Sequence, residues 1–266
     1  MESGMDYWAA KAALDWLVEL GADEAIGEVP VDRFALEASQ PKPAAQPAAG
    51  QPGSAAAPAQ QPQEADPVEV ATRMAGQAAT LEALRAALGG FEHCELKQGA
   101  RNLVFADGTE AGRVMIIGEA PGRDEDREGL PFVGRAGQLL DRMLAAIDLG
   151  RTHPDAERGV YITNILPWRP PQNRDPTAEE IGMMLPFMRR HIELVDPEAI
   201  VLMGNISCQA MLGRRGITRL RGTWTEVAGR PALPMFHPAY LLRNPHAKRE
   251  AWADLLALRA RLEGLE

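Results

Sequence analysis

Cysteine is scarce in this sequence. Among 266 residues there are two, Cys94 and Cys208. Two thiols cannot build a disulfide framework, and unaided they cannot form a four-thiolate metal site. Such sparing use of cysteine is typical of proteins in a reducing compartment, so we expect a cytoplasmic protein.

Long hydrophobic runs are also missing. The clean apolar runs, such as residues 199–203, are a few residues long, whereas a membrane span needs about 20. The N-terminus reads MESGMDYW and lacks the basic region of a secretory signal. We therefore expect no membrane contact. The phosphate-binding patterns GxxxxGKS/T and GxGxxG are absent as well, which disfavours binding of nucleoside triphosphates.

Basic residues are fewer than acidic residues in this sequence, and the formal net charge is −9. The excess of acids lies in residues 1–70, and the rest of the chain is close to neutral. Residues 205–249 carry eight Arg and Lys against one acid, Glu226. This stretch either forms a local basic field that meets phosphates or is neutralised by acids elsewhere in the fold. Charge alone leaves both interpretations open.

A linker separates the N-terminus from a globular region. Of the 29 residues 38–66, 26 are Ala, Pro, Gln, Gly or Ser. These side chains bury too little apolar surface to offset the entropy of ordering. We predict an N-terminal segment over 1–37, a disordered linker over 38–73 and a catalytic-type domain over 74–266.

The N-terminal segment contains one helical pattern. Trp8, Ala12, Trp16 and Leu20 recur every four residues within residues 5–20, which predicts an amphipathic helix. Its polar face is acidic, which disfavours membrane attachment. Either this helix packs on the main domain or it docks on another protein.

From residue 74 onward, strand and helix patterns alternate, which indicates an α/β fold with a parallel sheet covered on both faces. We predict strands at 113–118, 160–164, 199–204 and 232–236. We predict helices at 74–88, 136–147, 178–195, 205–212 and 250–262. In such sheets, ligands bind beyond the carboxyl ends of the strands.

The loops that follow the four strands hold the candidate site residues. Asn164 carries an amide that can read the edge of a base, with a turn-capping role as the alternative. His237 can donate to a developing oxyanion, or it can be a core histidine. Phe132 can stack on a flat ligand, or it can pack beneath its loop.

Three sequence blocks carry a family resemblance. GEAPGRDEDREGLPFVGRAGQLLD, YITNILPWRPPQNRDPT and HPAYLLRNP resemble the signature blocks of family-four uracil-DNA glycosylases, in the same order. The similarity extends from about Leu81 to the C-terminus. It implies a three-layer αβα sandwich around a four-stranded parallel sheet. It also implies a DNA repair enzyme that flips uracil out of DNA and hydrolyses its N-glycosidic bond, leaving an abasic site.

The resemblance also implies roles for individual residues. Phe132 would stack on uracil, Asn164 would pair with its edge, and His237 would stabilise the leaving base. Ala120 stands where another branch of glycosylases has a catalytic Asp, so Glu125, and after it Glu119, are the candidates to position the water; Glu125 could instead crowd the methyl group of thymine. The turn around the base would comprise Gly118, Ala120, Pro121 and Gly122.

DNA contacts are implied at two further places. Asn205 and Ser207, with the helix N-terminus there, would hold a phosphate. Leu241, Leu242 and Arg243 would enter the minor groove. We expect a monomer whose partners are uracil-containing DNA and a protein that binds the N-terminal helix.

Of the four cysteine ligands that hold the iron–sulfur cluster of that family, this sequence keeps one. Its four cysteine positions align with Phe91, Cys94, Trp168 and Met184. One thiolate cannot hold such a cluster. We expect the three large apolar side chains to fill its volume, and we expect neither cofactor nor metal.

Three alternatives remain open. One is a protein that binds abasic or damaged DNA without catalysis. Another is a magnesium-dependent nucleotide hydrolase that uses the acids of loop 118–137, Glu119, Asp124, Glu125, Asp126 and Glu128. The last is an adaptor that recruits a repair or replication partner through the N-terminal helix, which is compatible with glycosylase activity.

Overall fold

The structure is a computed structural model that describes residues 66–265. The predicted N-terminal helix and most of the predicted linker therefore lie outside the described residues. One part of the linker prediction is wrong, because residues 67–73 belong to helix α2 (Pro67–Gln77). Asp66 accepts a hydrogen bond from the Val68 N–H, and Pro67 occupies the first helical turn, where its missing N–H costs nothing.

Six strands form one mixed sheet in the order β1-β3-β2-β4-β6-β5. The strands are β1 (Ala106–Gly108), β2 (Val114–Gly118), β3 (Val160–Asn164), β4 (Ala199–Met203), β5 (Thr225–Val227) and β6 (Arg230–Met235). The four predicted parallel strands are confirmed as β2, β3, β4 and β6. The short strands β1 and β5 were not predicted and pair antiparallel at the two edges.

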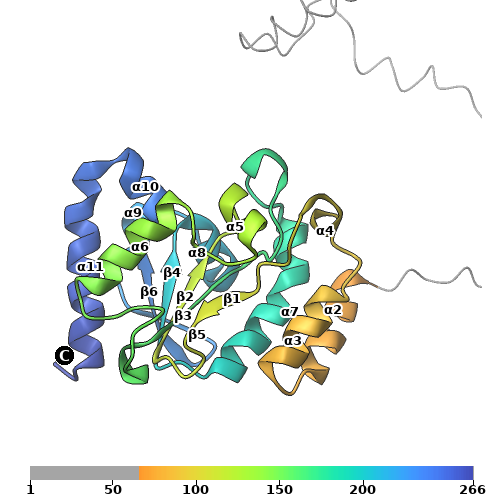
Figure 1. Cartoon of the computed structure of the whole chain (residues 1–266), viewed down its shortest axis with the longest axis horizontal. Helices are drawn as coiled ribbons and strands as arrows, with labels where there is room; N and C mark the ends of the chain where they lie inside the picture. Colours follow the sequence, from red (N-terminus) through yellow and green to blue (C-terminus); the bar gives the residue numbers. More distant parts are fainter. Residues whose placement is uncertain (1–65, 266) are drawn as a thin grey trace, which may run out of the picture. The chain divides into compact units, whose positions relative to one another are not determined.

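Helices cover both faces of this sheet (Figure 1). The longer ones are α2, α3 (Leu81–Gly89), α6 (Arg135–Ala145), α7 (Ala178–Val195), α8 (Asn205–Leu212) and α11 (Lys248–Leu262). The shorter ones are α4 (Leu96–Gly99), α5 (Arg123–Glu128), α9 (Ile217–Leu220) and α10 (Pro238–Arg243). One predicted helix, 74–88, is instead divided between α2 and α3. The division follows from Thr80, whose hydroxyl caps α3 by accepting from the Ala83 N–H.

The alternation of side chains along each strand divides the core in two. On β2, Met115 and Ile117 join the cluster that packs under α2, α3, α7 and α8. Val114 and Ile116 join the cluster that packs under α6 and α11. Successive side chains of a strand point to opposite faces, so one buried strand supplies both layers. This confirms the three-layer α/β architecture.

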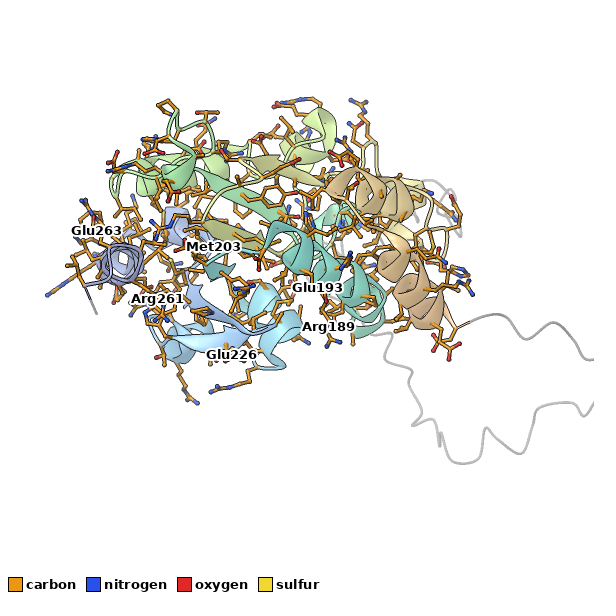
Figure 2. All side chains as sticks on the ribbon, turned by 90° about the horizontal axis from the view of Figure 1, so that it is seen from below. Arg189, Glu193, Met203, Glu226, Arg261 and Glu263 are labelled. Carbon is orange, nitrogen blue, oxygen red and sulfur yellow. The ribbon has the colours of Figure 1, made fainter. Side chains whose placement is uncertain are left out.

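A view from below shows the same layering (Figure 2). Met203, at the end of β4, lies between α11, marked by Glu263, and α7, marked by Arg189 and Glu193. Among residues 66–265, no helix combines the length and the apolar character that crossing a membrane requires.

The strand order reverses direction at β2. From β2 the chain proceeds to β3 on one side and then to β4 on the other. Such a switch point opens a crevice at the carboxyl ends of the strands, where ligands of α/β proteins bind. The loops that follow β2, β3, β4 and β6 all meet there.

Candidate active site

A cleft of about 590 Å³ lies at this switch point. Its size is within the range of small-molecule sites. Residues of all four predicted loops line it, together with Arg215 and Ile217, which precede and begin α9. Lining residues from the predicted set are Glu119, Ala120, Pro121, Gly122, Glu125, Phe132, Asn164, Asn205, His237 and Arg243. The structure thus brings together ten predicted residues that are scattered over more than 120 positions of the sequence.

Gly118 lies directly behind two residues of the cleft. It ends β2 and pairs with Asn164 at the end of β3. A Cβ at this position would lie 2.2 Å from Asn164 Oδ1 and 2.6 Å from the Phe132 ring, so any side chain here would clash with both. Gly118 therefore allows the amide and the ring to approach one another.

Asn164 presents a buried amide to the cleft. The residue is 5% exposed and lines the cleft. Asn164 is not among the described residues whose polar atoms are fully buried without a partner, so its amide atoms reach the cleft and can meet a ligand there as donor and acceptor. The geometry therefore favours recognition of a flat molecule with a neighbouring donor and acceptor over the turn-capping alternative.

His237 is held as a neutral imidazole with a defined tautomer. It lies between β6 and α10, and its Nδ1 accepts a hydrogen bond from the Ala239 N–H at 3.1 Å. Burial, and secondarily the nearby Arg243, lowers the pKa of His237 to about 4. A neutral ring that accepts at Nδ1 carries its proton at Nε2. His237 is therefore a hydrogen-bond donor toward a ligand at neutral pH.

Phe132 lies against this histidine. The two ring centroids are 5.4 Å apart and the rings are inclined by 26°. Phe132 is only 5% exposed and lines the cleft. The aromatic ring, the imidazole donor and the amide of Asn164 thus share one wall of the cleft.

Glu119 is a half-buried carboxyl group in the same cleft. Burial is the main cause that raises its pKa to about 7; the carboxylate of Asp175 raises it further, and Arg215 opposes the shift. Strongly shifted carboxyl groups in clefts are frequent at catalytic centres. Near neutral pH this group can hold or release a proton.

Glu125 is engaged differently. One carboxylate oxygen accepts from the N–H groups of Val133 and Gly134 at 3.0 and 2.9 Å. The other accepts from the Gly122 N–H at 3.1 Å. Both oxygens are therefore bound to backbone, and the Gly122 N–H is not available to a substrate. The carboxylate of Glu125 orders the loop, whereas we expected it to position water.

The acids of α5 do not converge on a common point. Asp126 accepts from the N–H groups of Arg101 and Asn102, and Asp124 pairs with Arg127 at 3.1 Å. Within the part of the chain that the structure describes, His, Cys, Asp and Glu side chains form no cluster of three suited to a metal.

Two of the predicted DNA contacts are wrong. Ser207 is fully buried, and its hydroxyl donates to the Gly204 carbonyl. Leu241 is 1% exposed and belongs to the core on the inner face of α10. A helix of this length buries one face, and the sequence pattern did not indicate which leucine lies on it. Leu242 is half-buried and Arg243 is exposed, so both remain available.

Asn205 lies in the cleft, but its side-chain oxygen is already bound within the protein. It lines the cleft, but its Oδ1 accepts from the N–H groups of Gly216 and Ile217 at 3.0 and 2.8 Å. It thereby fastens the loop before α9 to the start of α8. That loop brings Arg215 to the rim, where it pairs with Asp175 at 3.3 Å. Sequence reasoning missed these two as site residues, although Arg215 belongs to the basic stretch at 205–249.

The residues at the family's cluster positions do not fit an iron–sulfur cluster. Phe91, Trp168 and Met184, called the apolar plug below, are each at most 2% exposed and belong to one hydrophobic cluster with Cys94. Phe91 packs edge-on against Phe187, with the ring centroids 5.5 Å apart. Burial raises the pKa of the Cys94 thiol, which opposes the thiolate form that iron requires.

Comparison with known proteins agrees with the geometry. The family model of the Uracil DNA glycosylase superfamily matches residues 105–256. The Type-4 uracil-DNA glycosylase of Archaeoglobus fulgidus is 39% identical over 170 residues, covering 60% of this chain and 82% of that protein. That of Sulfurisphaera tokodaii is 35% identical over 192 residues, covering 68% and 84%.

A more distant similarity points the same way. The Type-5 uracil-DNA glycosylase of Pyrobaculum aerophilum is 33% identical over 144 residues, covering 50% of this chain and 63% of that protein. The matched family model spans more than half of the chain and contains every element of the cleft. The chain therefore belongs to the uracil-DNA glycosylase superfamily, with its resemblance to the family-four enzymes.

Proposed function

We propose that this protein excises uracil from DNA by hydrolysing the N-glycosidic bond and leaves an abasic site. The observation that carries the proposal is that the neutral His237 donor and the amide of Asn164 line one cleft. Relatives named uracil-DNA glycosylases support it. The base must leave the DNA stack to enter the cleft, and uracil pays least because its mispair with guanine is weak.

Asn164 is suited to read the uracil edge. Its NH₂ group donates to O4, and its Oδ1 accepts from N3–H. Cytosine presents a donor in place of O4 and an acceptor at N3, so both contacts fail. Each unsatisfied buried group costs about 1–3 kcal/mol, which is enough to discriminate between the two bases. The ring of Phe132 supplies a stacking surface for the flipped base.

His237 is suited to stabilise the leaving group. When the glycosidic bond breaks, negative charge develops on uracil O2 and the sugar takes oxocarbenium-like character. A neutral Nε2–H that points at O2 strengthens its hydrogen bond as that charge grows. Because the imidazole needs no extra proton, the donor is present throughout the neutral pH range.

Glu119 is the better candidate to position the water. Its carboxylate lines the cleft, whereas both oxygens of Glu125 are bound to backbone N–H groups. With a pKa of about 7, Glu119 acquires its negative charge as the pH rises through neutrality. An ionised carboxylate can both orient water and stabilise a cationic sugar. Leu242 and Arg243 on α10, of which Arg243 also lines the cleft, are the candidates to enter the minor groove of the DNA.

The test is a nicking assay on labelled oligonucleotides that contain one uracil, thymine or cytosine at the same position. We expect alkali-labile sites with uracil alone, in the presence of excess EDTA. His237→Ala is the inactivating variant, and His93→Ala, an exposed histidine outside the cleft, is its matched control. Tight binding of abasic DNA without turnover by the wild type would replace this proposal with the non-catalytic alternative.

A further inference from the structure

Phe132 has a backbone conformation that its sequence does not favour. Its φ is 54°, in the left-handed region that a bulky non-glycine residue rarely adopts. Such conformations persist only where surrounding contacts hold them, and they cluster at functional sites. The contacts that hold Phe132 therefore bear on how its ring is presented to the cleft.

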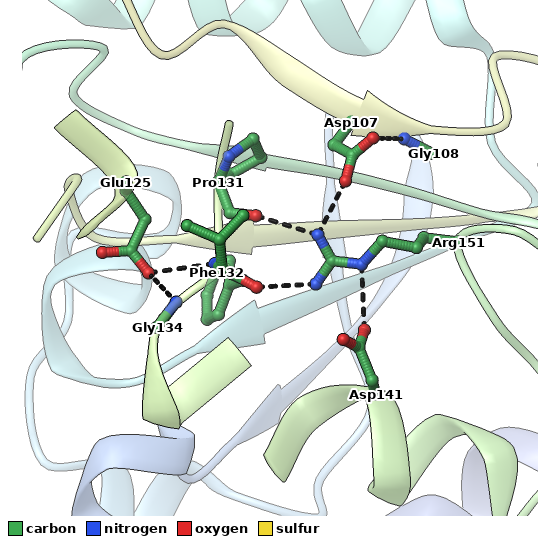
Figure 3. A network of polar contacts seen from close by, with 9 residues as sticks. Asp107, Gly108, Glu125, Pro131, Phe132, Gly134, Asp141 and Arg151 are labelled. Atoms are coloured by element: carbon green, nitrogen blue, oxygen red, sulfur yellow. Dashed lines mark hydrogen bonds and ion pairs between the residues drawn. The ribbon is translucent and has the colours of Figure 1, made fainter. Parts of the chain in front are cut away.

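The guanidinium group of Arg151 binds the backbone carbonyl groups of the loop that contains Phe132. Arg151 donates from Nη1 to the Pro131 carbonyl at 2.9 Å and from Nη2 to the Phe132 carbonyl at 2.8 Å (Figure 3). Two carboxylates hold the guanidinium in turn, with Asp107 at 2.7 Å and Asp141 at 2.9 Å. Four donor contacts from one planar group fix its position, and the side chain is only 11% exposed.

An anion holds the amide side of the same loop. Glu125 accepts from the N–H groups of Val133 and Gly134, the two residues that follow Phe132 (Figure 3). Consecutive carbonyls therefore face a positive charge, and the consecutive amides after them face a negative one. Helix α6 closes the third side, since a Cβ on Gly137 would lie 1.7 Å from the Phe132 carbonyl oxygen. The peptide units around Phe132 cannot rotate without breaking this pattern.

We propose that Arg151 is a positioning residue for excision, which acts by holding Phe132 in the left-handed conformation that presents its ring to the base. Arg151 does not line the cleft, so it acts through Phe132. It connects β1 through Asp107 and α6 through Asp141 to the stacking loop. The planar fork of arginine is required, because the compact ammonium of lysine cannot reach two carbonyls and two carboxylates at once. The role in excision rests on the proposed function.

The test is a double-mutant cycle between Arg151 and Phe132. Single-turnover excision is measured for Arg151→Lys in the native and the Phe132→Ala backgrounds, with Arg142→Lys, an exposed arginine of α6 outside the cleft, as the matched control. In the native background we expect a loss of about tenfold, while in the Phe132→Ala background we expect less than about twofold. Arg142→Lys should stay within about twofold, because it makes the same exchange away from the loop carbonyls. Equal losses in both backgrounds would overturn the proposal, since they would mean a general structural role.

A second readout does not depend on activity. Amide hydrogen exchange of a peptide spanning residues 130–136 is followed without DNA, after thermal melting has shown that the variants are folded. We expect faster exchange in Arg151→Lys than in the wild type and no change in Arg142→Lys. Unchanged exchange in Arg151→Lys would refute the proposal that Arg151 holds the loop around Phe132. Lack of uracil excision by the wild type, together with the expected exchange, would instead refute the proposed function alone.

Discussion

The cleft and the apolar plug are built from neighbouring segments but by different physical means. Asn164 and Trp168 are four residues apart, yet one presents single hydrogen-bonding atoms to a ligand and the other fills volume. In the cleft, exchanging a few atoms removes a specific contact that no neighbour replaces. In the plug, apolar side chains of similar volume substitute for one another at modest cost. The two regions should therefore respond differently to substitution, one in activity and the other in stability.

Among substitutions in the cleft, we expect the largest loss of excision activity from His237→Ala. Removing the Nε2–H donor should lower the single-turnover excision rate by about a hundredfold or more, since the donor acts on charge that develops in the transition state. Binding of abasic-site DNA should change far less. A wild-type rate in this variant would show that the oxyanion donor lies elsewhere.

Asn164→Asp should cost somewhat less. The substitution removes the NH₂ donor to uracil O4 and adds a negative charge beside it, for a loss of about 10- to 100-fold in excision. The matched control is Asn173→Asp, which lines the same cleft from a more exposed position. Equal behaviour of the two variants would argue against base reading by Asn164.

The apolar plug should show the opposite pattern. Phe91→Ala removes a fully buried ring and should destabilise the protein by about 3–5 kcal/mol, as measured by denaturant unfolding. Excision per folded molecule should stay near the wild-type value. The purified wild type should contain no iron and lack absorbance near 400 nm. Stoichiometric iron would contradict the assignment of the plug.

Glu119 gives a pH signature that the plug cannot give. Its carboxyl group has a raised pKa of about 7, so the ionised form, and with it excision, should increase as pH rises from about 6 to 8. Glu119→Gln should lower the rate and flatten this rise. A rise that persists unchanged in Glu119→Gln would assign the titration to another group.

The smallest effect is expected from removing residues 1–65, which carry ten acids and three bases and so a charge of −7. Asp66 is kept because it caps α2. Excision on short oligonucleotides should be nearly unchanged, and affinity at low salt should be equal or higher. The difference should fade near physiological ionic strength, where the Debye length is about 8 Å. A markedly slower truncated protein would contradict this expectation.

Sequence reasoning reached the central sheet and most of the cleft because both follow from local patterns. Buried parallel strands are continuous apolar runs, and the loops after them gather at one edge. It missed β1 and β5 because three residues carry too little pattern. It misplaced Leu241 and Ser207 because burial of one face of a helix depends on what packs against it. Arg151 has no local motif at all, since its role depends on contacts with residues 10 to 44 positions away.

The short edge strands have a consequence for association between copies of the folded protein. Parallel strands with apolar faces invite pairing with other chains when their edges are open. Here β1 and β5 close the two ends of the described sheet with three residues each. An incoming strand would find few free amides on either side. The folded sheet therefore offers little template for edge-to-edge aggregation.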